Sequence, residues 1–215
     1  TLAWYELIPI FSYIFQGGKS LHSKTKLSIQ YPLVEAGAGV LFLLTFQKLW
    51  PIIFKAPASF IIGILFYFFV FSLFIIIFVY DLKHKIIPNF FVWMFNISAL
   101  FVVLFFYPTL WTILAGPIIA LPLFLLWFFS KGKWLGFGDV KFALGMGWLL
   151  GISGGLSALL LSFWIGAVVG IFILLIKKTK NHEIPFAPFL VLATVLCFLY
   201  NIDMNYISKI FTSFI

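Results

Sequence analysis

Arginine is absent from this sequence, and charge of either sign is scarce. Only 9% of the 215 residues are charged, whereas roughly 25% are charged in an ordinary soluble domain. The 14 basic residues are all lysines, and there are 6 acidic residues. So few charged side chains cannot cover the surface of a soluble protein of this size, which excludes a soluble domain.

Cysteine is nearly absent as well. The one cysteine, Cys197, lies within an apolar run, so the chain has neither a disulfide framework nor a cysteine-based metal site. A net charge of +8 would favour nucleic acid as the partner of a soluble protein, but these lysines lie in short loops between apolar runs. We therefore interpret them as orientation signals and expect no nucleic acid partner.

Apolar residues fill the rest of the chain. They make up 64% of it, the mean hydropathy is +1.17, and Phe alone contributes 30 residues. Several apolar runs reach the roughly 18 residues that indicate a helix crossing a bilayer. We expect an all-α polytopic membrane protein with about seven transmembrane helices, near 33–50, 59–80, 90–107, 110–129, 140–150, 155–176 and 185–201. The fifth is short for a crossing unless it extends through the glycine-rich "GISGG".

The lysines predict how this chain lies in the membrane. We expect residues 1–32 to form a small cytoplasmic or interfacial segment, 33–201 the transmembrane domain and 202–215 a C-terminal tail. If the first segment is cytoplasmic and all seven helices cross, the far side holds only Lys48, Lys55 and Lys209. Every other lysine is then cytoplasmic, in agreement with the positive-inside rule, so this orientation is the one we predict.

Two aspartates fall at the cytoplasmic edge in this topology. Asp81 ends the second expected helix, in "FVYDLKHKIIPN", and Asp139 begins the fifth, in "GFGDVKF". Helix ends at one membrane depth can bring two carboxyls within a few ångströms of each other, where they would share one proton. That is the chemistry of an aspartic protease. Because Asp139 has the positive end of its own helix nearby and Asp81 does not, we expect the proton on Asp81.

The glycines before the second aspartate fit this interpretation. Gly136 and Gly138 flank Phe137, and we expect them to give the backbone the freedom to adopt positive φ angles and to let an extended substrate approach closely. Other readings remain open, since an aspartate after G-x-G can also cap a helix. A presenilin-like or signal-peptide-peptidase-like protease would use a similar pair of acids. An ion or proton transporter would too, although its acids typically lie near the midplane at broken helices.

Four stretches of the sequence carry a likeness to a known family. They are "WYELIPIFSY" with "YPLVE", "YDLKHKIIPN", "GFGDVKFALGMGWLLG" and "IPFAPFL", in this order and over nearly the whole chain. With them the chain resembles the type IV prepilin peptidases, intramembrane aspartic proteases of the G-x-G-D class. The resemblance implies that Asp81 and Asp139 are catalytic. It also implies that type IV prepilins or type II secretion pseudopilins lose a short basic leader at the cytoplasmic face of the inner membrane.

Other residues of these stretches receive supporting roles. Lys141 belongs to the second aspartate motif, and Pro185 and Pro188 open the last expected helix, where the likeness implies that they shape the cleft. Glu35 follows "YPLV" and Glu6 lies in "WYELIP". For each glutamate we expect either a place facing the substrate or a structural anchor at the membrane interface.

The resemblance also raises the question of cofactors. Many members also methylate the new N-terminus with S-adenosylmethionine, and these often carry two C-x-x-C pairs that hold zinc. The second pair would fall here at Ser20 and Ser23, whose hydroxyls cannot replace thiolates, and His22 alone makes no metal site. We expect no zinc and no cofactor for the peptidase reaction, and methylation stays open. The first pair, and an eighth helix, would precede Thr1.

Overall fold

The computed structural model describes residues 10–19, 26–177 and 184–212 of the chain. Helices make up 83% of these described residues, which form no β-strand. The predicted all-α class is therefore confirmed. Among these residues five helices are long and apolar enough to cross a membrane, at Gln30–Ile52, Pro57–His84, Asn89–Phe106, Leu110–Ser130 and Phe137–Ile176.

The chain forms two compact units, Thr1–Ile75 and Ile76–Ile215. The described elements of the first are α1 (Phe11–Phe15), α2 (Gln30–Leu49), the 3₁₀ helix η2 (Trp50–Ile52) and most of α3 (Pro57–His84). Within it the rings of Phe42 and Phe68 stack with their centroids 4.7 Å apart. This contact joins α2 to α3.

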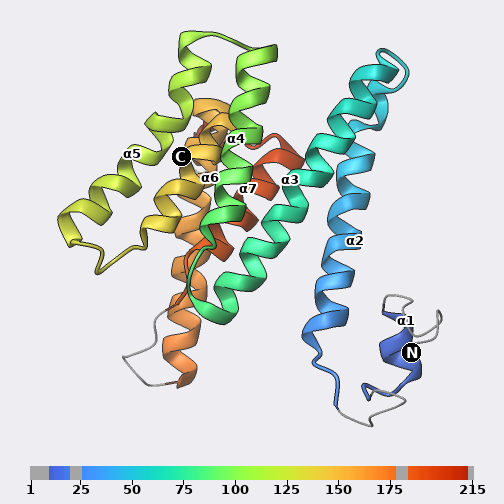
Figure 1. Cartoon of the computed structure of the whole chain (residues 1–215). Helices are drawn as coiled ribbons and strands as arrows, with labels where there is room; N and C mark the ends of the chain where they lie inside the picture. Colours follow the sequence, from blue (N-terminus) through green and yellow to red (C-terminus); the bar gives the residue numbers. More distant parts are fainter. Residues whose placement is uncertain (1–9, 20–25, 178–183, 213–215) are drawn as a thin grey trace. The chain divides into compact units, whose positions relative to one another are not determined.

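The second unit is built around α6. Its elements are the end of α3, α4 (Asn89–Phe106), α5 (Leu110–Ser130), α6 (Phe137–Lys177), α7 (Ala187–Tyr200) and α8 (Met204–Thr212), as Figure 1 shows. α6 contacts α4, α5, α7 and α8. Small residues let the helices approach closely, because a Cβ on Gly116 would lie 2.5 Å from the indole of Trp148 and one on Gly155 would lie 2.8 Å from Ile119.

α6 is not one straight helix. Gly151 has φ 72° and ψ −178°, a conformation that glycine adopts because it lacks a Cβ. A Cβ on Gly155 would lie 3.5 Å from the Cα of Gly147, whereas residues eight apart in a straight helix are about 12 Å apart. α6 therefore turns back at Gly151 into two arms (Figure 1).

These arms correspond to two of the seven predicted spans, those at 140–150 and 155–176. The first arm begins at Phe137, three residues before the predicted start at 140. The second arm begins directly after the break at Gly151. The stretch "GISGG", through which the short fifth span could have extended, is helical except at its first residue, Gly151. The remaining predicted span, 185–201, is the short apolar helix Ala187–Tyr200.

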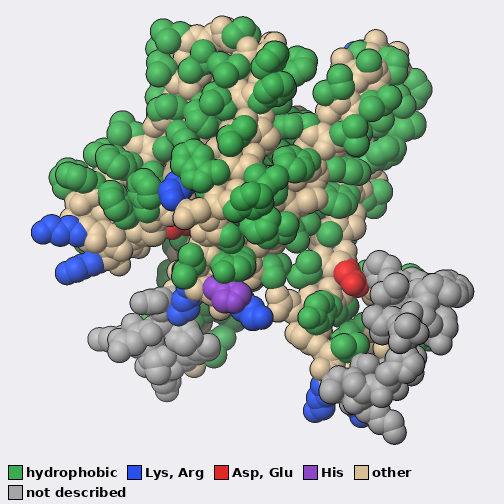
Figure 2. Space-filling view, in the orientation of Figure 1, with side chains coloured by type: hydrophobic (Ala, Val, Ile, Leu, Met, Phe, Trp, Pro, Cys, Tyr) green, Lys and Arg blue, Asp and Glu red, His purple; other side chains and the backbone are tan. Residues whose placement is uncertain are grey.

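The outer surface of the second unit is apolar. Large hydrophobic side chains are turned outward, with Phe105 68% and Leu175 72% exposed. Hydrophobic side chains cover most of the face drawn in Figure 2, and the cationic side chains of this unit that are visible on that face lie toward one end of its helices. An exposed apolar surface of this extent is typical of a membrane contact. The chain is therefore a multi-pass membrane protein.

Candidate active site

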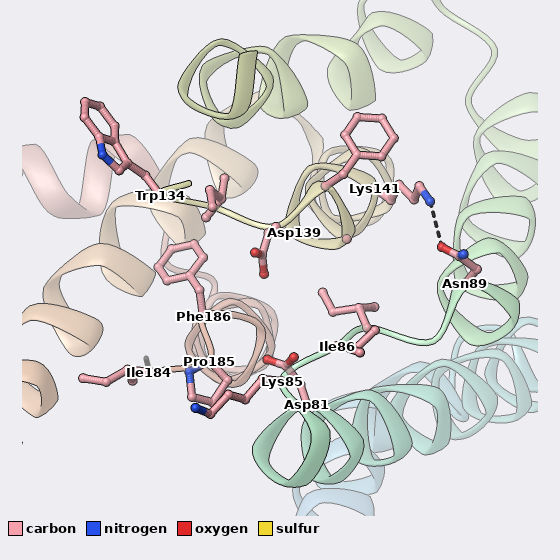
Figure 3. A pocket seen from close by; sticks show the side chains of 15 residues that line it. Asp81, Lys85, Ile86, Asn89, Trp134, Asp139, Lys141, Ile184, Pro185 and Phe186 are labelled. Carbon is pink, nitrogen blue, oxygen red and sulfur yellow. Dashed lines mark hydrogen bonds between the residues drawn. The ribbon is translucent and has the colours of Figure 1, made fainter. Parts of the chain in front are cut away.

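A pocket of about 430 Å³ lies in the second unit, where α3 ends and where α6 and α7 begin. Three stretches of the chain line it: residues within 81–89, residues within 134–141, and residues 184–186. Figure 3 shows their side chains around a common space. Segments that are far apart in the sequence thus meet at one site, which contains both of the predicted aspartates.

Asp81 lies in the last turn of α3 and is 4% exposed. Its carboxylate accepts a hydrogen bond from the backbone N–H of Ala187, the first residue of α7. The residue before Ala187, Phe186, makes no side-chain capping bond of its own. Asp81 therefore takes the place of a capping side chain for another helix, where the positive end of the helix favours a negative charge.

Asp139 lies in the first turn of α6 and is 7% exposed. Its carboxylate accepts a hydrogen bond from the backbone N–H of Gly136, and its own N–H donates to the Gly136 carbonyl at 3.2 Å. The expectation that only Asp139 has a helix N-terminus beside it was wrong. Each carboxylate lies at such an end, so helix position does not assign the shared proton to Asp81.

The two aspartates point into the same space (Figure 3). They are close enough for the charge of Asp81 to act directly on the Asp139 carboxyl. Two nearly buried carboxyls in one space cannot both carry a full negative charge without a large electrostatic cost, and such an arrangement favours sharing one proton. The pocket can therefore supply one proton acceptor and one proton donor to a bound reactant.

The glycines of the motif do not act as the sequence predicted. Neither Gly136 nor Gly138 has a positive φ, so neither uses the conformational freedom that the sequence suggested. A Cβ on Gly136 would lie 3.4 Å from Asp139, an ordinary contact. A Cβ on Gly138 would lie 2.8 Å from the Cβ of Ile87, which is closer than such atoms approach. Gly138 is thus required by packing against the link between α3 and α4.

Lys141 lies in the pocket wall, and α4 holds it. Its ammonium donates a hydrogen bond to Asn89 Oδ1 at 2.7 Å and lies 5.1 Å from the ring centroid of Phe137. Its carbonyl accepts a hydrogen bond from Asn96 Nδ2 at 3.0 Å. Sequence reasoning did not single out Asn89 or Asn96, because a helical apolar run gives no sign of which of its polar residues faces a distant helix.

The two prolines take different places. Pro185 lines the pocket ahead of the helix, and Pro188 is a buried residue in the first turn of α7. The prediction that α7 begins at Pro185 was therefore two residues early. Next to them, the ring of Phe186 lies 5.0 Å from that of Phe163 on the second arm of α6. This contact connects the pocket wall to α6.

The remaining predicted residues lie elsewhere. Glu35, in the first unit, accepts a hydrogen bond from the Ile10 backbone N–H at 2.7 Å, which is the contact of a structural anchor. Glu6 and the zinc-type positions Ser20, His22 and Ser23 lie outside the described residues. Within the described parts of the chain, no group of three or more His, Cys, Asp or Glu side chains could hold a metal ion.

The fold and the pocket define a class: a multi-pass helical membrane protein with two buried carboxyls in one cavity. Comparison with family models assigns the chain more closely. Residues 1–49 match the bacterial peptidase A24 N-terminal domain, and residues 68–171 match the type IV leader peptidase family. The chain belongs to the type IV leader peptidase family.

Curated relatives agree with this assignment. A prepilin leader peptidase/N-methyltransferase of Xanthomonas campestris pv. campestris is 30% identical over 94% of this chain and 70% of its own length. One of Bacillus subtilis is 32% identical, over 94% of this chain and 78% of that protein. No solved structure matches the chain. The chain is therefore a peptidase. Its membership of this family favours the interpretation as a prepilin peptidase over a presenilin-like or signal-peptide-peptidase-like protease and over a transporter.

Proposed function

We propose that this protein is an intramembrane aspartic endopeptidase in which Asp81 and Asp139 are the catalytic pair. The observation that carries the proposal is their arrangement: two nearly buried carboxyls from separate helices line one pocket, and each accepts a backbone N–H bond. This holds both side chains in place before a substrate arrives, as acid–base catalysis requires.

The shared proton supports hydrolysis of a peptide bond. The ionised carboxylate takes a proton from a water molecule while the oxygen of that water attacks the scissile carbonyl carbon. The protonated carboxyl donates its proton to the carbonyl oxygen. The tetrahedral diol then collapses. The carboxylate accepts a proton from a hydroxyl of the diol, and the protonated carboxyl donates its proton to the leaving amine as the C–N bond breaks. The pair is left singly protonated, ready for the next cycle.

The substrate we propose is a type IV prepilin or pseudopilin, because the relatives are named prepilin leader peptidases. Such a substrate presents its cleavage site next to an apolar helix. Trp134 is 77% and Phe137 41% exposed at the edge of the pocket, and they would provide an apolar contact for that helix.

The proposed location is the inner membrane with the pocket at the cytoplasmic edge. α3 has 28 residues, more than the roughly 20 that a bilayer crossing needs, and Asp81 lies in its last turn. The relatives' names also include N-methyltransferase. We assign no residues of this chain to S-adenosylmethionine, so methylation is a separate question for the same experiment.

The test uses the whole protein reconstituted in liposomes with a prepilin-type substrate carrying a basic leader. The mass of the mature N-terminus reports the cleavage site and any added methyl group together. Asp81→Asn and Asp139→Asn should each lower the cleavage rate by at least about 1,000-fold, as removal of a catalytic side chain does in other proteases. Both substitutions keep the size of the side chain, so folding should be preserved.

Asp203→Asn is the matched control. Asp203 accepts the Tyr206 backbone N–H at 2.8 Å at the start of α8 and does not line the pocket. This variant should cleave at the wild-type rate. If a folded Asp81→Asn or Asp139→Asn protein kept more than a tenth of the wild-type rate, the aspartic mechanism would be wrong.

A further inference from the structure

Gly138 and Ile87 make an unusually close contact beside the aspartates. A Cβ on Gly138 would lie 2.8 Å from the Cβ of Ile87, 3.1 Å from its Cδ1 and 3.2 Å from its Cγ1. Ile87 is 8% exposed. A change of rotamer can move Cδ1 and Cγ1, but the Cβ is fixed to the backbone. Any side chain at position 138 therefore has to displace the backbone of the segment that carries Ile87.

The segment that carries Ile87 is short, and its backbone has little freedom to move. Ile87 lies in the link between His84, the end of α3, and Asn89, the start of α4. Lys85 already has a left-handed φ of 55°, and its N–H bonds the Asp81 carbonyl at 2.8 Å. Pro88, with φ −66°, is the residue before α4. A displacement of Ile87 must therefore be passed on to the end of α3 or to the start of α4.

The start of α4 is not free to move away from α6. Asn96 donates to the carbonyl of Lys141, and the Lys141 ammonium donates to Asn89. These two hydrogen bonds tie α4 to the first arm of α6, which also carries Asp139. A displacement of Ile87 would therefore move the end of α3, which carries Asp81.

We propose that the contact between Ile87 and Gly138 is a spacer that sets the separation of the two carboxyls. Ile87 is joined to Asp81 through the short link, and Gly138 directly precedes Asp139. Both are positioning residues, since they act through the aspartates. The proposal rests on the proposed function, in which one water must reach both carboxyls; a misplacement of about 1 Å can cost such a reaction about 100-fold.

A double-mutant cycle tests the spacer. Gly138→Ala should lower kcat by about 10- to 100-fold and change KM less than about threefold, because it displaces the reacting groups and leaves the rim of the pocket in place. Ile87→Gly removes the opposing Cβ. The variant with both substitutions should therefore recover at least about tenfold in kcat over Gly138→Ala alone, which a general loss of stability would not produce.

Gly63→Ala is the matched control for adding one methyl group to a helix. Gly63 lies inside α3, and a Cβ there would meet nothing within 4 Å, so kcat should not change. The spacer is refuted if folded Gly138→Ala keeps the wild-type kcat. It is also refuted if the double variant is no faster than Gly138→Ala.

A second measurement does not depend on activity. In a Cys197→Ala background, cysteines at positions 87 and 138 should form a disulfide on mild oxidation in membranes, because their Cβ atoms lie within the range that a disulfide spans after a shift of about 1 Å. Proteins that carry only one of the two cysteines should show no change in migration on a non-reducing gel. Absence of the cross-link would overturn the contact itself.

The two proposals fail in different ways. If Asp139→Asn cleaves normally, the catalytic assignment is wrong, and the double-mutant cycle no longer reports on the spacing of the carboxyls. The disulfide cross-link still reports the contact between positions 87 and 138. If Asp139→Asn is inactive while Gly138→Ala is fully active, the spacer alone is wrong.

Discussion

Asn89 and Lys141 meet across the pocket wall, 52 positions apart in the chain. The Lys141 ammonium donates to Asn89 Oδ1 at 2.7 Å, and the carbonyl of the same lysine accepts from Asn96, two turns further along α4. Figure 3 shows the ammonium directed toward Asn89 and not toward the aspartates. A cation close to two carboxyls is thus held away from them by an amide on another helix.

Asn89→Ala should lower kcat by about tenfold. Without its acceptor, the Lys141 ammonium can turn toward the carboxyl pair, where an added positive charge favours the doubly ionised form and removes the proton that the reaction needs. The measurement is the rate of leader cleavage under saturating substrate.

Lys141→Met provides the check on this explanation. If Asn89 acts by holding Lys141, then adding Asn89→Ala to Lys141→Met should change kcat less than twofold. Fully additive losses in the double variant would show that Asn89 acts on the reaction by another route.

Gly147→Ala should destabilise the second unit by about 1–3 kcal/mol, the usual cost of overpacking. A Cβ at Gly147 would collide with the backbone carbonyl of Ala115 and lie 2.8 Å from the Cα of Gly116. Backbone atoms cannot move aside as a side chain does, so α5 and α6 would be pushed apart. Unfolding in detergent micelles, followed by circular dichroism, measures the change.

Gly63→Ala again serves as the comparison for stability. An alanine there meets open space, and alanine is favoured over glycine inside a helix by about 0.5–1 kcal/mol. A Gly147→Ala protein as stable as Gly63→Ala would contradict the packing we describe between α5 and α6.

Glu35→Ala should raise the hydrogen-exchange rate of the Ile10 amide by about tenfold. Glu35 accepts that N–H at 2.7 Å, and Ile10 has φ 64°, which a β-branched residue rarely adopts. A bond to a charged acceptor contributes about 1.5–3 kcal/mol when shielded, and less when exposed as here. Glu35→Gln keeps an acceptor and should show a smaller increase; equal rates in all three proteins would mean that the bond does not hold Ile10.

Chelation should leave leader cleavage unchanged. The pocket offers two carboxylates and no third His, Cys, Asp or Glu side chain, and no group of three such side chains that could hold a metal occurs among the described residues. Cleavage should proceed at the same rate after treatment with EDTA and with 1,10-phenanthroline. Inhibition that added Zn²⁺ reverses would contradict a metal-free peptidase reaction.

Much of the site was predictable because its parts follow from membrane physics. An acidic residue in so apolar a chain must lie at an edge or in a polar pocket, and the lysine pattern predicted the same edge for Asp81 and Asp139. Their motifs supplied the family. The break in α6 was anticipated as well, since "GISGG" begins with Gly151, where the turn occurs.

What the sequence could not predict depends on contacts between distant segments. The roles of Gly138, Asn89 and Ala187 arise only where α3, α4, α6 and α7 meet. A glycine required by close packing looks the same in a sequence as one required for a left-handed turn. The dipeptide Pro88–Asn89 marks a helix start, but nothing in it shows that the asparagine holds a lysine from another helix.

Because α6 reverses at Gly151, the length of its second arm sets where the side chains of that arm meet the pocket wall. Phe163 on that arm contacts Phe186 in the pocket wall, so the number of residues between the turn and this contact sets where the wall lies relative to the aspartates. Each residue added or removed there would shift the contact by about 1.5 Å and rotate it by about 100°. The length of this largely buried helical stretch, with Ser157 and Ala158 fully buried, is therefore tied to the position of the pocket wall.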